Sequence, residues 1–161
     1  MKYILLLNRL WLNLTSFIAP KYCGKRAVSI FSKVRRKEFR KQEKPFYEQA
    51  KKFEVKRENE NISCYELGNP EGKLLFLVHG WESNPGCFTK FIPHIDSYRI
   101  IAFTLPGHAH NEETHTNLYV CKDAFKAVIN HINPTEPFHV VAHSMGSAIT
   151  SFALSEMDYE A

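Results

Sequence analysis

Cysteine is scarce in this chain, and its distribution excludes a disulfide-rich scaffold. The 161 residues include only four cysteines, and none of them forms a Cys-x-x-Cys pair. They are Cys23, Cys64, Cys87 and Cys121. A secreted domain of this type needs a denser framework of cysteines. The sequence therefore predicts four free thiols, a reducing compartment and a cytoplasmic location.

A long unbroken apolar run is also absent. Polar residues interrupt the apolar stretch near the N-terminus at Asn8, Arg9 and Asn13, which argues against a secretory h-region and a membrane span. The apolar residues of this stretch fall at helical spacing on one face. They are Leu7, Leu10, Trp11, Leu14, Phe17 and Ile18. The pattern predicts an amphipathic helix that packs on other helices or on the body of the protein, or alternatively lies on a membrane surface.

Charge is distributed unevenly along the chain. Residues 1–50 carry 12 Lys/Arg and 3 Asp/Glu, a net charge of +9, whereas residues 51–161 carry 9 and 14, a net charge of −5. The basic residues are not accompanied by a base-stacking platform or a base-reading motif, so a solvated helical face is favoured and no nucleic-acid partner is expected. We predict a basic, partly amphipathic helical N-terminal extension over residues 1–50, which could contact a membrane peripherally.

From residue 53 onward the periodicity changes to that of strands. Residues 53–56 and 62–67 alternate between apolar and polar side chains around a polar turn, which predicts a hairpin. Three apolar strands follow, and a helical pattern comes after each of them. We therefore expect an α/β fold over residues 53–161, with a mostly parallel sheet and helices on both faces.

Three turns directly follow the three apolar strands, at the sheet edge where such folds place their active sites. Their sequences are His79-Gly80-Trp81-Glu82-Ser83, Pro106-Gly107-His108 and Ala142-His143-Ser144-Met145-Gly146. In the third turn, small residues on both sides of Ser144 permit a tight strand-to-helix turn with an exposed hydroxyl. The alternative is an ordinary helix start at which Ser144 only caps the helix.

The chain resembles the serine α/β-hydrolases in all three turns. The third is similar to their Gly-x-Ser-x-Gly nucleophile elbow, with Ala142 in place of the first glycine, and the first is similar to their oxyanion segment. The second is similar to Asp-x-Pro-Gly-His-Gly, with Thr104 and Ala109 as departures. The resemblance implies that Ser144 is the nucleophile and that the backbone N–H groups of Trp81 and Met145 form the oxyanion hole.

The same resemblance implies a small-molecule acyl-ester substrate and no cofactor. A serine at this position argues against dehalogenase or epoxide hydrolase chemistry, which uses an aspartate there. In this fold the acid and the histidine of the triad follow the nucleophile, but the 17 residues after Ser144 contain no histidine. We expect the N-terminal half of a hydrolase, truncated after the elbow helix and inactive alone, with acid and base beyond Ala161. The alternative is a non-catalytic, hydrolase-like binding or membrane-associated protein.

The histidines near these turns have structural explanations. His143 is expected to point away from the serine, His79 to support the oxyanion loop, and His108 to stabilise its own turn. A rival interpretation is a metal site on one loop, built from His108, His110, His115, Glu112 and Glu113. Because that loop lacks a further ligand on another strand, we predict no metal.

Overall fold

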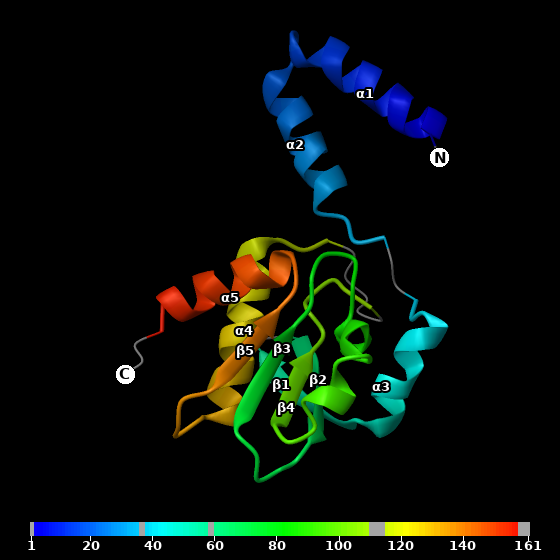
Figure 1. Ribbon diagram of the computed structural model, residues 1–161. Coiled ribbons are helices and arrows are strands. Elements are labelled where there is room, and N and C mark those ends of the chain that lie inside the picture. The colour runs from blue at the N-terminus through cyan, green and yellow to red at the C-terminus, as the bar shows by residue number, and fades with distance from the viewer. Residues whose placement is uncertain (1, 36–37, 58–59, 110–114, 158–161) are drawn as a thin grey trace. The chain divides into compact units, whose positions relative to one another are not determined.

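The computed structural model describes residues 2–35, 38–57, 60–109 and 115–157, and the chain divides into two compact units at Lys33/Val34. The first unit contains the helices α1 (Lys2–Ser16) and α2 (Pro20–Phe31). The second contains, in chain order, η1 (Lys41–Glu43), α3 (Lys44–Gln49), β1 (Lys51–Arg57), β2 (Glu60–Gly68), β3 (Leu74–Val78), η2 (Pro85–Phe88), η3 (Ile92–His94), β4 (Arg99–Phe103), α4 (Leu118–Ile132), β5 (His139–Ala142) and α5 (Met145–Ser155), where η denotes a 3-10 helix (Figure 1).

The first unit is a helical hairpin. Its helices are joined by a contact of 2.9 Å between Thr15 Oγ1 and Cys23 Sγ. Pro20 lies in the first turn of α2, where its missing N–H costs nothing. Gly24 lies inside α2. A membrane-crossing helix needs more length and apolar character than any helix in the described ranges has.

Residues 34–50 cluster with the second unit, although we expected the N-terminal extension to continue to residue 50. The reason is burial: Phe46 is 1% exposed and packs with the core on one face of the sheet, and Glu43 is 2% exposed. The basic composition of this stretch gave no indication that Phe46 and Glu43 are buried.

The sheet of the second unit has the strand order β1-β2-β4-β3-β5. β1 and β2 form the expected antiparallel hairpin, and β2 pairs antiparallel with β4. β4, β3 and β5 are parallel, with Phe76 of β3 opposite Ile101 and Val140. The connections between these parallel strands contain helices, as an α/β fold requires.

Both faces of the sheet are covered, so the apolar runs of the central strands are buried on both sides. Phe76 and Val78 face a core with α4 and α5, whereas Leu75 and Leu77 face a second core formed with α3, η2 and η3. This alternation follows from the two-residue period of a strand. The predicted fold class, an α/β sheet with helices on both faces, is confirmed.

The region 85–95 corrects one local prediction. We expected a single helix after Asn84, but the structure has two short 3-10 turns, η2 and η3. Asn84 caps η2, because its side chain accepts a hydrogen bond of 2.9 Å from Gly86 N–H. Pro93 lies in the first turn of η3 and lacks the N–H that a continuous helix would need there.

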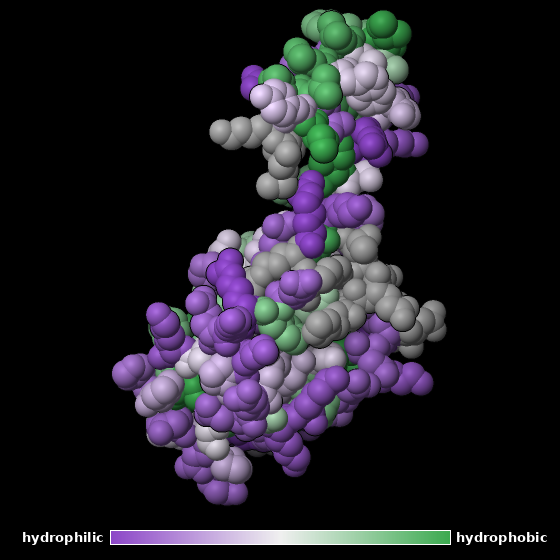
Figure 2. Space-filling model, turned by 90° about the vertical axis from the view of Figure 1, so that its right-hand side faces the viewer, coloured by the Kyte–Doolittle hydropathy of each residue, from purple (hydrophilic) through white to green (hydrophobic). Residues whose placement is uncertain are grey.

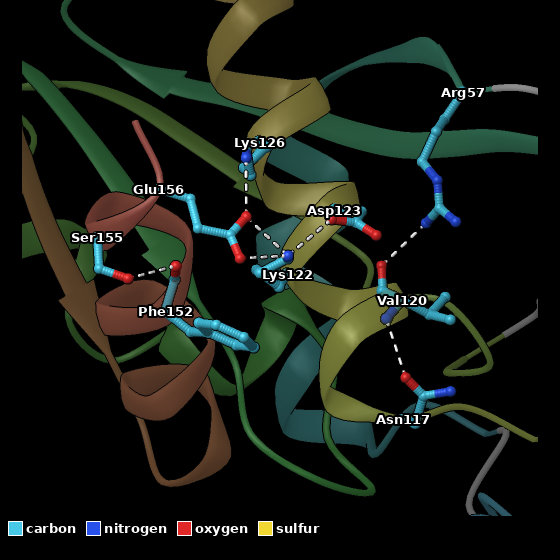
Figure 3. Close-up of polar contacts among 9 residues, drawn as sticks. All are labelled: Arg57, Asn117, Val120, Lys122, Asp123, Lys126, Phe152, Ser155 and Glu156. Carbon is cyan, nitrogen blue, oxygen red and sulfur yellow. Dashed lines mark hydrogen bonds and ion pairs between the residues drawn. The ribbon is translucent and has the colours of Figure 1, made fainter. Parts of the chain in front are cut away.

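Polar contacts join the C-terminal end of α5 to α4 (Figure 3). Lys122 Nζ of α4 donates to both carboxylate oxygens of Glu156, at 2.8 and 2.7 Å, and Lys126 Nζ lies 2.9 Å from Oε2. At the start of α4, Asn117 Oδ1 accepts from Val120 N–H. The helix that begins beside Ser144 is thus fixed at its far end.

Candidate active site

Ser144 occupies the turn between β5 and α5 in a conformation that is rare for a residue with a side chain. Its φ is 55° and its ψ is −123°. A backbone held in such a region costs about 1–3 kcal/mol, which the surrounding packing must offset. The side chain is exposed and makes no capping hydrogen bond to α5. The alternative in which Ser144 serves only as a helix cap therefore does not fit this turn.

The first glycine of the elbow motif can be replaced by Ala142, whereas the second, Gly146, cannot be replaced without a collision. Ala142 lies within β5 and pairs with Val78, so an ordinary strand conformation accommodates its methyl group. Gly146 packs against the carbonyl groups that end β3. A Cβ at this position would lie 2.7 Å from His79 O and closer still to Val78 O.

The loop after β3 lies directly against the elbow. His143 N–H donates to Val78 O at 2.9 Å, which joins the ends of β5 and β3. A Cβ on Gly80 would stand 2.9 Å from both Ser144 Cβ and His143 O. Two of the three turns predicted from the sequence therefore meet in space, and Gly80 permits their close approach.

His79 fixes the peptide group that carries the Trp81 N–H. The imidazole is fully buried, its Nε2 accepts from Leu105 N–H at 3.1 Å, and its Nδ1 lies 2.8 Å from Gly80 O. Because Nε2 is an acceptor, the proton of the neutral ring is on Nδ1, which donates to the Gly80 carbonyl. The peptide is trans, so Trp81 N–H points away from His79.

His108 brings the second turn to the same place. Its Nδ1 lies 3.0 Å from Pro106 O, and its ring centroid is 5.4 Å from that of Trp81 and 5.2 Å from that of His79. Ala109 has a φ of 48°, at the position where the serine α/β-hydrolases have a glycine. The expectation that His79 and His108 have structural roles agrees with these contacts.

His143 lies at the surface, and most of the candidate metal ligands lie outside the described residues. His143 is exposed, and its Nδ1 lies 3.2 Å from the position of a Cβ on Gly80. Of the metal interpretation, His110, Glu112 and Glu113 lie outside the described residues. Among the residues that are described, no three His, Cys, Asp or Glu side chains could hold a metal ion together.

Sequence reasoning missed a buried polar cluster behind the loop. Glu43 Oε2 accepts from Arg40 N–H at 2.8 Å and from Asn84 Nδ2 at 2.9 Å, and Tyr47 OH donates to Asn84 Oδ1 at 2.8 Å. Burial raises the pKa of the Tyr47 hydroxyl far above its usual value. The sequence offered no signal for this cluster, because Arg40 lacks the acceptor oxygen that the first residue of a capping box supplies.

A cavity of about 530 Å³ adjoins the elbow. Its apolar wall is formed by Trp81, Phe88, Phe91 and Val141, and His143 contributes to the lining. A cavity of this size and character suits a small ligand.

Parts of the chain are similar to known proteins. The 30 kDa subunit of a magnesium chelatase from Rhodobacter capsulatus is 35% identical over 52% of this chain and 31% of its own length. A probable oxidoreductase, EphD, of Mycobacterium tuberculosis is 32% identical over 53% of this chain and 15% of its own. This chain thus spans less than a third of either relative. An esterase of Pyrococcus furiosus has a similar fold, with a TM-score of 0.64, 19% identity, and coverage of 79% of this chain and 52% of that one.

Residues 73–157 match the family model described as the alpha/beta hydrolase fold. This region comprises β3, the Gly80 loop, the elbow and all of α5. Because it makes up more than half of the chain, the protein belongs to the alpha/beta hydrolase fold family.

Proposed function

We propose that the protein is a serine hydrolase of carboxylic esters or related acyl compounds. Ser144 is the nucleophile, and the backbone N–H groups of Trp81 and Met145 receive the charge on the carbonyl oxygen. The observation that carries the proposal is the backbone of Ser144, held at a φ of 55° in contact with the Gly80 loop.

The proposed reaction begins with attack of Ser144 Oγ on the acyl carbon. The hydroxyl proton passes to a general base as the C–O bond forms, and the carbonyl oxygen becomes an oxyanion. Two backbone donors suit that charge. Met145 N–H is the first of α5 and has no acceptor within the helix, and Trp81 N–H belongs to the peptide that His79 orients. Collapse of the intermediate expels the alcohol, which takes the proton back from the base, and leaves Ser144 acylated. Water then attacks the acyl group, which releases the acid and restores the serine hydroxyl.

The described residues do not supply the general base or its acidic partner. No described side chain forms a hydrogen bond with the Ser144 hydroxyl. We propose that an acidic residue and a histidine beyond Ala161 complete the triad in the whole protein. The position of the cavity beside the elbow supports an acyl or alcohol group of modest size as its occupant. The four free thiols support a reducing, cytoplasmic setting.

A fluorophosphonate probe tests the proposal, because it reacts with serines that are activated in this way. The complete protein, with any residues that naturally follow Ala161, should be labelled at Ser144, and Ser144→Ala should abolish labelling. Ser151→Ala, which removes an exposed serine from α5, the helix that follows the elbow, is the matched control and should remain labelled. If the complete protein is not labelled, or if Ser144→Ala is labelled as strongly as the wild type, the hydrolase assignment fails and a non-catalytic binding role takes its place.

A further inference from the structure

The α1–α2 hairpin carries its most apolar side chains on the outside. Phe17 is 91% exposed, Ile18 87%, Leu14 71% and Val28 67%. Figure 2 shows hydrophobic residues gathered on this hairpin, whereas hydrophilic residues dominate the visible face of the second unit. Isolated apolar residues on a surface are ordinary, but a contiguous group of this size marks a surface that contacts something else.

The contacts within the hairpin use a different set of residues. Thr15 bonds Cys23, which is 6% exposed, and the rings of Trp11 and Tyr22 meet at 5.8 Å. Half-buried Leu12 and Thr15 are three residues apart in α1 and therefore lie along one side of that helix. The exposed leucines are consequently not needed to hold the two helices together.

The charge of this unit indicates what the apolar face contacts. Residues 1–33 contain six basic residues and no acidic residue. They are Lys2, Arg9, Lys21, Lys25, Arg26 and Lys33. A second copy of the hairpin would bring two such groups of like charge together, which opposes association. A bilayer with anionic headgroups offers apolar acyl chains and negative phosphates at the same surface, and basic segments are attracted to it.

We propose that the α1–α2 hairpin binds the surface of membranes that contain anionic phospholipids. The exposed apolar side chains of the hairpin, among them Leu10, Leu14, Phe17 and Ile18, enter the boundary between headgroups and acyl chains. The basic side chains contact the phosphates. Asn8, Arg9 and Asn13 lie within α1, so the helix lies along the membrane plane. Trp11 lies at the depth where amphipathic rings are favoured. The proposal concerns the first unit alone and does not depend on the hydrolase activity.

Vesicle flotation with the full chain tests the charge requirement. Binding is expected to vesicles of phosphatidylglycerol and phosphatidylcholine, to decrease with added salt, and to be far weaker with phosphatidylcholine alone. Lys25→Gln/Arg26→Gln should weaken the partition coefficient about 25-fold, at roughly five-fold for each charge. Lys51→Gln/Lys52→Gln removes the same charge from exposed positions of β1 and should leave binding unchanged. If both double variants lost vesicle binding equally, the result would contradict a membrane-binding site in the hairpin.

A second measurement tests the apolar face. The chain has two tryptophans, so Trp81→Phe leaves Trp11 as the only one. Its emission should shift to the blue on addition of anionic vesicles and should be quenched by lipids brominated in their acyl chains. Leu10→Gln/Leu14→Gln, which keeps good helix formers, should abolish both effects and weaken binding at least about 100-fold.

Other occupants of the apolar face would give different results. If the face covered the second unit, Trp11 would be protected from aqueous iodide without vesicles, and lipid would not change its emission. If a second copy covered it, the chain would be dimeric by light scattering, and Leu10→Gln/Leu14→Gln would yield monomers without affecting flotation. Either result overturns the proposal.

Discussion

Substitution of Gly146 by alanine tests how closely the elbow helix lies against β3. In an ordinary helix this change stabilises a protein by about 1 kcal/mol. Here the added Cβ would lie 2.7 Å from His79 O and closer still to Val78 O, which are backbone atoms of a buried strand end. Overpacking costs about 1–3 kcal/mol, and the upper end applies because neither carbonyl can rotate away. The net loss is about 2 kcal/mol.

Urea unfolding can measure this loss in the second unit alone. In a Trp11→Phe background, Trp81 is the remaining tryptophan and reports on the second unit. With a slope of about 2 kcal/mol per molar urea, the midpoint should fall by about 1 M. Ser151→Ala, at an exposed position later in α5, is the control and should raise the midpoint slightly, since alanine is the better helix former.

An unchanged or raised midpoint for Gly146→Ala would refute the reasoning. It would mean that α5 can move away from the end of β3 at no cost, and hence that Met145 N–H is not held in place. A lower midpoint together with a changed slope would instead indicate altered compactness of the native or unfolded state.

Three further predictions concern side chains around the site. His79→Phe should lower the free energy of unfolding by about 2–4 kcal/mol in urea titrations, because it leaves two buried backbone groups without partners; a loss under 1 kcal/mol would contradict the assigned bonds. Lys122 holds the pKa of Glu156 below its usual 4.5, so the stabilisation is complete above that pH and is lost as pH falls through the lowered pKa. The difference in unfolding free energy between wild type and Glu156→Gln should therefore be present at pH 7 and disappear once the pH falls below the lowered pKa; a difference that persists in stronger acid would contradict the ion pair. Burial raises the pKa of Cys64 to about 12, so iodoacetamide should alkylate half-buried Cys87 well before Cys64 in the native protein, as mass spectrometry of peptides would detect.

The local elements around the site could be predicted because their signals are short in sequence. An apolar run, a Pro-Gly or small-residue turn and a helical stripe each depend on a few neighbouring residues, and β3, β4, β5, α4 and α5 all follow such patterns. The roles of Ser144, Trp81 and Met145 remain predictions, because the geometry positions these residues without demonstrating the reaction. Residues 34–50 cluster with the second unit, and their charge gave no signal that Phe46 and Glu43 are buried.

The sequence by itself determined the order of strands and helices and placed three turns after parallel strands, because hydrophobic period and turn chemistry are local. Only the tertiary structure decided that β4 lies between β2 and β3, and that Gly80 and Gly146 are the points where the elbow is packed. It also decided that Glu43 bonds Asn84 across 41 residues, and that Leu14, Phe17 and Ile18 are not used for packing within the helical hairpin. These features depend on which distant surfaces meet, and no local pattern specifies that.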